Sequence, residues 1–157
     1  MFLVSDTQVT RHARIGAFAG KDAAIGAILA AVDFEWTIRR VIIGCGYHTN
    51  KHIRDRILSR CHGLEQYKTA WKSEVIHQFP NAPLLPALVP NWDFVVSQAF
   101  PLRHRLVHGI VGTTGEPFAK KRTKALIAAS VALALFAAEK GVDVYSRLPI
   151  RRVRRQL

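Results

Sequence analysis

Residues 125–138 read ALIAASVALALFAA, and this stretch without a charged residue decides the fold class. It lies in a longer segment that is helical in pattern from about Pro117 to Lys140 and that stops at Gly141, a residue type suited to a helix end. Because the stretch is apolar on every side, its helix should lie in the core or in a dimer interface. It is shorter than the roughly 20 apolar residues that a membrane-spanning helix requires.

A second long helix is predicted upstream. Asp22 is a suitable N-cap residue, and Gly44 and Gly46 should end the helix. One apolar face at helical spacing consists of Ile25, Ile28, Leu29, Val32, Trp36 and Ile43. A second apolar surface consists of Phe34, Ile38, Val41 and Ile42. With two apolar surfaces, this helix should be central in the molecule or buried at an interface.

Weaker patterns predict further helices on either side of the central one. Residues 6–18 form a weak helical pattern, with Ser5 or Asp6 as a possible cap. Residues 53–78 carry apolar side chains every three or four positions, which predicts an amphipathic helix that tolerates Gly63 in its interior.

Prolines organise the second half of the chain. Pro80, Pro83, Pro86 and Pro90 predict an extended connector and not a helix. Asn91 should cap the next helix, which Pro101 either kinks or restarts, and a turn is expected over residues 112–117. The sequence therefore predicts an all-α bundle of four or five helices. We expect a single domain over residues 1–157, with a basic C-terminal tail at about 147–157.

The charge balance points to anionic partners. Lys and Arg number 23 against 11 Asp and Glu, which gives a formal net charge of +12. A field of this sign attracts nucleic acid or an anionic membrane surface, although a basic protein that merely stays soluble is the plain alternative. The two cysteines exclude a disulfide-rich scaffold, and the apolar run 1–4 is too short for a signal peptide. We expect a cytoplasmic protein.

The sequence RHRLVHG, residues 103–109, carries the residue types that phosphodiester chemistry needs. Arg103 can hold two phosphate oxygens without losing its charge, and His108 can transfer protons near neutral pH. Residues five apart on an ideal helix point about 140° apart, so Arg103 and His108 do not share a face. His104 and His108 do share one, and their spacing suits a metal pair or a stacked polar face equally well.

The motif resembles the Rx4-6H motif of the HEPN superfamily, with its arginine at Arg103, its polar position at His104 and its histidine at His108. The chain as a whole looks like a HEPN domain of the RiboL-PSP-HEPN type found beside defence ribonucleases. Its likeness extends to a long helix with the acidic-aromatic centre Asp33–Trp36 (DFEW), a second helix, a proline-rich connector, then the motif and a final helix. One departure is His104, where the superfamily more often has Asn or Asp.

The resemblance implies a metal-independent endoribonuclease of the toxin or defence type, with no cofactor. Two copies of the motif would face each other across a homodimer and cleave RNA to a 2′,3′-cyclic phosphate, with Arg103, His104 and His108 as catalytic residues. An antitoxin protein is a possible partner. Because some HEPN proteins bind nucleic acid or regulate partners without cleavage, a non-catalytic RNA-binding or regulatory protein is the alternative.

Two basic segments could contact RNA phosphates. The first is a basic cluster near the start of the last helix, made of Lys120, Lys121, Arg122 and Lys124. The alternative is that this cluster is only a solvated face of the helix. The second is the arginine tail, made of Arg147, Arg151, Arg152, Arg154 and Arg155, which could instead cover an acidic partner or be a disordered solubilising segment.

Other polar residues have plainer interpretations. Glu35 could orient a motif side chain or simply pair with Arg39 four residues later. Trp92 and Tyr67 are predicted to be core residues and not base-stacking platforms. A loose set of possible metal ligands, whose spacing matches no standard zinc module, consists of Cys45, His48, His52, Cys61 and His62. We therefore predict no metal site.

Overall fold

A computed structural model describes residues 6–110 and 114–151, and all of its regular structure in these ranges is helical. The all-α prediction is therefore confirmed. The helices are α1 (Gln8–Lys21), α2 (Ala23–Cys45), α3 (Asn50–His52), α4 (Leu64–Ala70), α5 (Leu85–Leu88), α6 (Trp92–Phe94), α7 (Phe100–Val107) and α8 (Glu116–Glu139). Wider π-helical turns occupy Ile53–Ile57, Trp71–Ile76 and Val95–Ala99, and a 3-10 turn occupies Leu58–Arg60.

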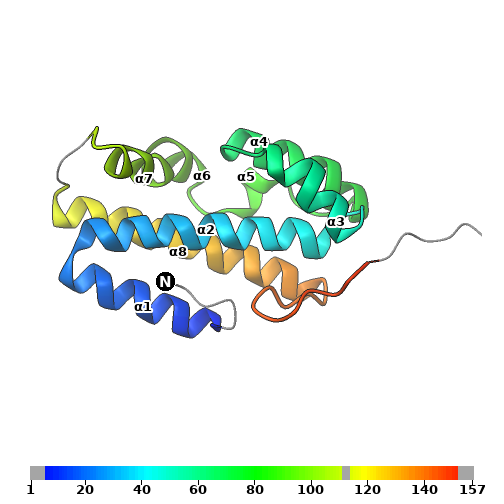
Figure 1. Ribbon diagram of the computed structural model, residues 1–157, viewed down its shortest axis with the longest axis horizontal. Coiled ribbons are helices and arrows are strands. Elements are labelled where there is room, and N and C mark those ends of the chain that lie inside the picture. The colour runs from blue at the N-terminus through cyan, green and yellow to red at the C-terminus, as the bar shows by residue number, and fades with distance from the viewer. Residues whose placement is uncertain (1–5, 111–113, 152–157) are drawn as a thin grey trace, which may run out of the picture.

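The two long helices predicted from sequence form the centre of the molecule. α2 and α8 lie side by side along much of their length, with α1 on one side and the segment α3–α7 on the other (Figure 1). The Asp22 carboxylate accepts hydrogen bonds from the backbone N–H groups of Ala24 and Ile25 at 2.9 and 3.3 Å, so its predicted N-cap role is confirmed. α2 ends at Cys45, beside the predicted Gly46.

The last helix ends as its sequence predicts. Gly141 adopts a left-handed φ of 76°, and its N–H donates to Ala138 O at 2.9 Å. The following N–H, of Val142, donates to Ala137 O at 2.9 Å. This pair of bonds is the Schellman ending of a helix, which only a residue without a Cβ adopts at no steric cost.

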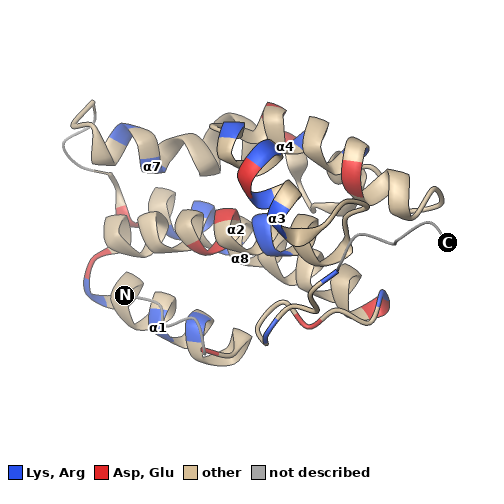
Figure 2. Ribbon diagram, turned by 45° about the vertical axis from the view of Figure 1, so that its right-hand side comes forward, with Lys and Arg blue, Asp and Glu red and all other residues tan. Residues whose placement is uncertain are grey.

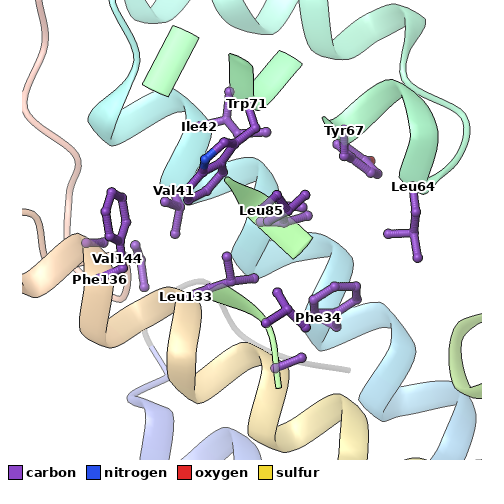
Figure 3. Close-up of a cluster of buried hydrophobic side chains, with 14 of the residues drawn as sticks. Phe34, Val41, Ile42, Leu64, Tyr67, Trp71, Leu85, Leu133, Phe136 and Val144 are labelled. Atoms are coloured by element: carbon purple, nitrogen blue, oxygen red, sulfur yellow. The ribbon is translucent and has the colours of Figure 1, made fainter. Parts of the chain in front are cut away.

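The main core fills the space between α2, α8 and the helices above them. Trp71, Phe34 and Leu133 lie in this core (Figure 3) and are fully buried. The indole N–H of Trp71 donates to Pro83 O at 3.0 Å, which attaches the proline-rich connector to the core. Tyr67 is also fully buried, which confirms its prediction as a core residue, and Trp92 packs partly buried against the same cluster.

Four local predictions are wrong. The helix predicted over 53–78 is interrupted, because the backbone leaves the helix at Cys61 and is extended at Gly63. Leu58, Cys61 and Leu64 all become buried around this break, and their packing outweighs the continuous helical pattern. The connector is not wholly extended, since α5 forms within it with a proline in its first turn, a position where proline is tolerated.

The third error concerns the cap before α6. Asn91 lies in the left-handed region with φ of 51°, and its side chain makes no capping hydrogen bond. From Trp92 to Val107 the helical backbone is continuous. It widens into the π-helical turn Val95–Ala99 just before Pro101, which relieves the clash between a proline ring and the carbonyl four residues earlier. The α-helical pattern of α7 begins at Phe100 with Pro101 in its first turn, which is the position that the restart alternative predicts. For α1, the cap is Thr7 rather than Ser5 or Asp6.

Candidate functional site

The predicted motif occupies the last turns of α7. His108 is the C-cap residue, and Gly109 follows with φ of 67°. The N–H of Gly109 donates to Leu106 O at 3.3 Å and the N–H of Ile110 donates to Arg105 O at 2.9 Å. This is a second Schellman ending, so the glycine that closes RHRLVHG has a structural role in stopping the helix.

The two histidines of the motif lie together on the surface. The ring centroids of His104 and His108 are 4.3 Å apart with an angle of 48° between the planes, and both side chains are exposed. The prediction that they share one face of the helix is confirmed. No hydrogen bond or ion pair joins Arg103 to either imidazole within the described ranges, which agrees with the 140° separation expected for Arg103 and His108.

Arg103 instead turns toward α2, where it meets Glu35. Its Nη1 donates to Glu35 Oε2 at 2.8 Å, with 39% of the arginine side chain and 24% of the glutamate side chain exposed. The structure thus brings Glu35 into contact with the motif arginine. The alternative pair is present too, since Arg39 Nη1 lies 4.0 Å from Glu35 Oε1. One carboxylate therefore lies between two guanidinium groups.

A buried tyrosine completes this polar cluster. Tyr67 donates its hydroxyl hydrogen to Glu35 Oε1 at 2.8 Å and accepts a hydrogen bond from Arg39 Nη1 at 2.8 Å. Burial is the main cause that raises the pKa of Tyr67, and the neighbouring Glu35 carboxylate raises it further. The phenol therefore stays protonated and acts as a hydrogen-bond donor. Arg39 also donates to Leu58 O at 3.1 Å. We call Glu35, Arg39, Tyr67 and Arg103 the arginine pair cluster.

Sequence reasoning missed the roles of Arg39 and Tyr67 in this cluster. Glu35 was a candidate to orient a motif side chain, and its spacing predicted a contact with Arg39, but nothing in the sequence placed Arg39 in the same cluster as Arg103. Tyr67 was predicted only as a core residue, and its hydroxyl reaches Glu35 across 32 positions of sequence. No local pattern signals a contact of that separation.

The acidic-aromatic centre of α2 faces two directions. Glu35 points to α7, whereas Asp33, about 200° away around an ideal helix, points to α1. Asp33 is fully buried and accepts hydrogen bonds from Arg11 Nε at 2.6 Å and from His12 Nε2 at 3.2 Å. Burial raises the pKa of Asp33, but the bonds from His12 and Arg11 outweigh it and hold the pKa below its ordinary value. This second cluster anchors α1 to α2.

The predicted basic cluster divides into exposed and buried members. Lys120, Lys121 and Lys124 are exposed, and Lys121 and Lys124 line a shallow groove of about 410 Å³ beside Phe94 of α6. Arg122 is buried, and it donates to Gln98 Oε1 at 2.6 Å and to Phe118 O at 3.0 Å. The expectation that Arg122 belongs to an RNA-binding surface is therefore wrong, because its guanidinium joins α8 to the helix that carries the motif.

The arginine tail is likewise not uniform. Arg151 donates to the backbone carbonyls of Ile43, Gly44 and Gly46 at the C-terminal end of α2, where a cation is favoured by the helix dipole. The alternative of a disordered solubilising segment is therefore wrong for this residue. Arg147 is exposed, and Arg152, Arg154 and Arg155 lie outside the described residues. Lys and Arg are spread over several helices and do not form one stripe in the view of Figure 2.

The cysteines and histidines considered as metal ligands do not gather into one cluster in the described residues. Cys45 and Cys61 are both buried, and burial raises the pKa of Cys45 to about 11. His48 hydrogen-bonds through Nδ1 to the buried Glu74 at 2.8 Å, and its ring stacks on His52 with centroids 4.6 Å apart. Across residues 6–110 and 114–151, no group of three or more His, Cys, Asp or Glu side chains is arranged to hold a metal ion.

In the same ranges, none of the helices has both the length and the apolar character needed to cross a bilayer. Comparison of the chain with protein-family models, curated proteins and solved structures finds no match.

Proposed function

We propose that this protein is an endoribonuclease of the toxin or defence type that cleaves RNA to a 2′,3′-cyclic phosphate with its own side chains. One observation carries the proposal. Arg103, half-exposed and held at 2.8 Å by Glu35, projects from the same helix end as two exposed imidazoles. The resemblance to HEPN domains, which rests on these same residues, is consistent with that chemistry.

Each part of the arginine pair cluster has a function in this proposal. Arg103 and Arg39 place two positive charges around the single negative charge of Glu35, so the cluster remains net positive and can bind a phosphate group. Tyr67 holds Glu35 in place by donating a hydrogen bond from its protonated hydroxyl to Oε1. Because the guanidinium is already held in position before the reaction, it can stabilise the negative charge that develops around the pentacoordinate phosphorus without first reorganising.

His108 transfers protons, and His104 supports it. Cleavage requires a base to accept the 2′-hydroxyl proton and an acid to protonate the 5′-oxygen, and imidazole can fill either role. In an in-line displacement these two groups lie on opposite sides of the phosphorus atom. The rings of His104 and His108 are 4.3 Å apart on one helix face, so they cannot take opposite sides of one phosphate. A second copy of the chain would supply the missing group.

Exposed apolar residues beside the motif support a homodimer. Val107 is 59% exposed and Ile110 is 63% exposed, on either side of His108 and Gly109. In Figures 1 and 2 the end of α7 lies at the same end of the molecule as the α1–α2 turn and the start of α8. Phe18, Ile25 and Phe118 on those elements are also at least 42% exposed. Burial of such side chains against a second copy would be favourable.

The test is cleavage of labelled RNA in the presence of EDTA. Native protein should produce fragments ending in a 2′,3′-cyclic phosphate, whereas Arg103→Ala and His108→Ala should each be inactive. His62→Ala, which removes an exposed histidine that is not part of α7, is the matched control and should cleave normally. A mixture of the two inactive variants should regain part of the activity if the site is shared between chains. Intact RNA with native protein, or full activity in both variants, contradicts the proposal.

The alternative is RNA binding without cleavage. The groove beside Lys121 and Lys124 favours it, because that groove is basic and independent of the motif. Binding through phosphates should weaken steeply with salt, and Lys121→Ala/Lys124→Ala should lower the slope by about two. Tight, salt-dependent binding by native protein that leaves the RNA intact would favour this alternative.

A further inference from the structure

The motif histidines have the geometry of a two-ligand chelate. His104 and His108 are four residues apart on the last turn of α7, which places their side chains one above the other. Two nitrogens on one tetrahedral zinc ion are about 3.4 Å apart, given Zn–N distances of about 2.1 Å. The centroids of the two rings are 4.3 Å apart, so rotation of the side chains can bring two ring nitrogens to this separation.

The surroundings also determine whether a cation is tolerated. The pair lies at the C-terminal end of a helix, where the dipole favours positive charge. Of the nearby cations, Arg103 is paired with Glu35 in a partly exposed contact and Arg105 is exposed to solvent, so that the repulsion of both toward a bound ion is screened. Both imidazoles are exposed, so an ion can reach them and keep water in its remaining positions.

A second histidine pair in the chain provides a comparison. His48 and His52 are also four residues apart, with ring centroids 4.6 Å apart. In that pair His48 is already held by Glu74, whose buried carboxylate is 2.8 Å from Nδ1, and the ring planes are closer to parallel at 30°. The two pairs therefore differ in their polar contacts, and the His48–His52 pair provides the control for binding at the motif.

We propose that His104 and His108 together bind one divalent transition-metal ion, of which Zn²⁺ is the chosen probe, and that the bound ion inhibits the site. Imidazole suits zinc and copper, and a nitrogen that ligates a metal cannot accept a proton. The inhibitory part rests on the proposed ribonuclease function, whereas the binding part does not.

Binding is tested by titrating Zn²⁺ into the full chain at pH 7.5 in a buffer that does not chelate metals, with calorimetry as the readout. Native protein should bind one ion per chain at the motif. Removing a residue that only hydrogen-bonds to a metal ligand lowers metal affinity about 10- to 100-fold. His104→Ala and His108→Ala each remove a direct ligand, so they should lower the affinity by at least as much.

His52→Ala is the matched control for binding, because it removes a histidine from the other stacked pair. It should retain the motif ion. All of these side chains are exposed, and circular dichroism checks that each variant keeps its helices. Native affinity in His104→Ala and His108→Ala, loss of binding in His52→Ala alone, or no binding by native protein would each overturn the proposal.

Inhibition is tested on RNA cleavage by native protein and by His52→Ala. Zn²⁺ should stop cleavage at the concentration that saturates the motif, EDTA should restore it, and Mg²⁺ should have no effect, since it prefers oxygen ligands. Cleavage that continues with the motif saturated would overturn the inhibitory role. If native protein cleaves no RNA even in EDTA, the proposed function fails, and the calorimetric result still decides whether the chelate exists.

Discussion

Arg103 of α7 and Glu35 of α2 are 68 positions apart in sequence and are joined by a 2.8 Å hydrogen bond between Nη1 and Oε2. The contact fixes the motif helix against the central helix of the bundle. It also determines the direction of the one arginine that the proposed chemistry needs.

Glu35→Gln should impair cleavage more than it impairs folding. The amide can still accept the Tyr67 hydrogen bond, but it loses the charge that holds Arg103. Misplacement of a catalytic group by about 1 Å costs up to roughly 100-fold in rate, so single-turnover cleavage should fall about 10- to 100-fold. Because the pair is partly exposed, the free energy of unfolding should change by no more than about 1 kcal/mol.

Glu65→Gln is the control for that change, since it removes the same charge from an exposed pair with Lys68. It should alter neither cleavage nor stability. RNA affinity, measured by fluorescence anisotropy, should not weaken in Glu35→Gln because the cluster becomes more positive. A rate equal to the native rate would show that Glu35 has no positioning role.

Tyr67→Phe should destabilise the protein. The change removes a buried hydroxyl that bonds to both Glu35 and Arg39. Hydrogen bonds to charged groups contribute about 1.5–3 kcal/mol, so the free energy of unfolding in urea should fall by an amount in that range. Tyr47→Phe, at an exposed tyrosine, should leave it unchanged. Equal stability of the two variants would show that the Tyr67 hydroxyl contributes little to the cluster.

Asp33→Asn should lower the free energy of unfolding at neutral pH, and the loss relative to native protein should be smaller in acid. Removal of one partner from a buried ion pair is destabilising by about 3–5 kcal/mol. The pKa of Asp33 in the folded protein lies below its ordinary value of 3.8, so its carboxylate stabilises the fold above that pH. This contribution is lost as the pH falls through the folded-state pKa.

The measurement is urea unfolding of native protein and Asp33→Asn at several values between pH 7 and pH 3. The difference in the free energy of unfolding between the two proteins should be constant near neutral pH. It should shrink below about pH 4, where the carboxyl group in the unfolded chain begins to be protonated. A difference that stays constant to the lowest pH would contradict the assignment.

Arg151→Ala should loosen the C-terminal end of α2. The substitution leaves the carbonyl groups of Ile43, Gly44 and Gly46 without their cationic donor. We expect a loss of about 1–3 kcal/mol in the free energy of unfolding and faster amide exchange near Gly46. Arg147→Ala removes the same charge from an exposed position and should have little effect. Similar values for both variants would show that Arg151 is not a structural cap.

The sequence alone determined where the strongest helices begin and end. Asp22 and Gly141 act through their own backbone and the next few residues, so their effects can be recognised locally. The pairing of His104 with His108 is also local, because four residues of helix place two side chains on one face whatever surrounds them.

Only the tertiary structure decided the contacts between helices. Gly63 lies in an unremarkable amphipathic pattern, yet the helix breaks there because burial of Leu58 and Leu64 on both sides of the break outweighs local propensity. Arg122 and Arg151 look like surface charges in sequence, but each is directed inward to partners on distant elements. The contact of Arg103 with Glu35 depends on how α7 packs on α2, and packing between distant segments leaves no periodic signal in either one.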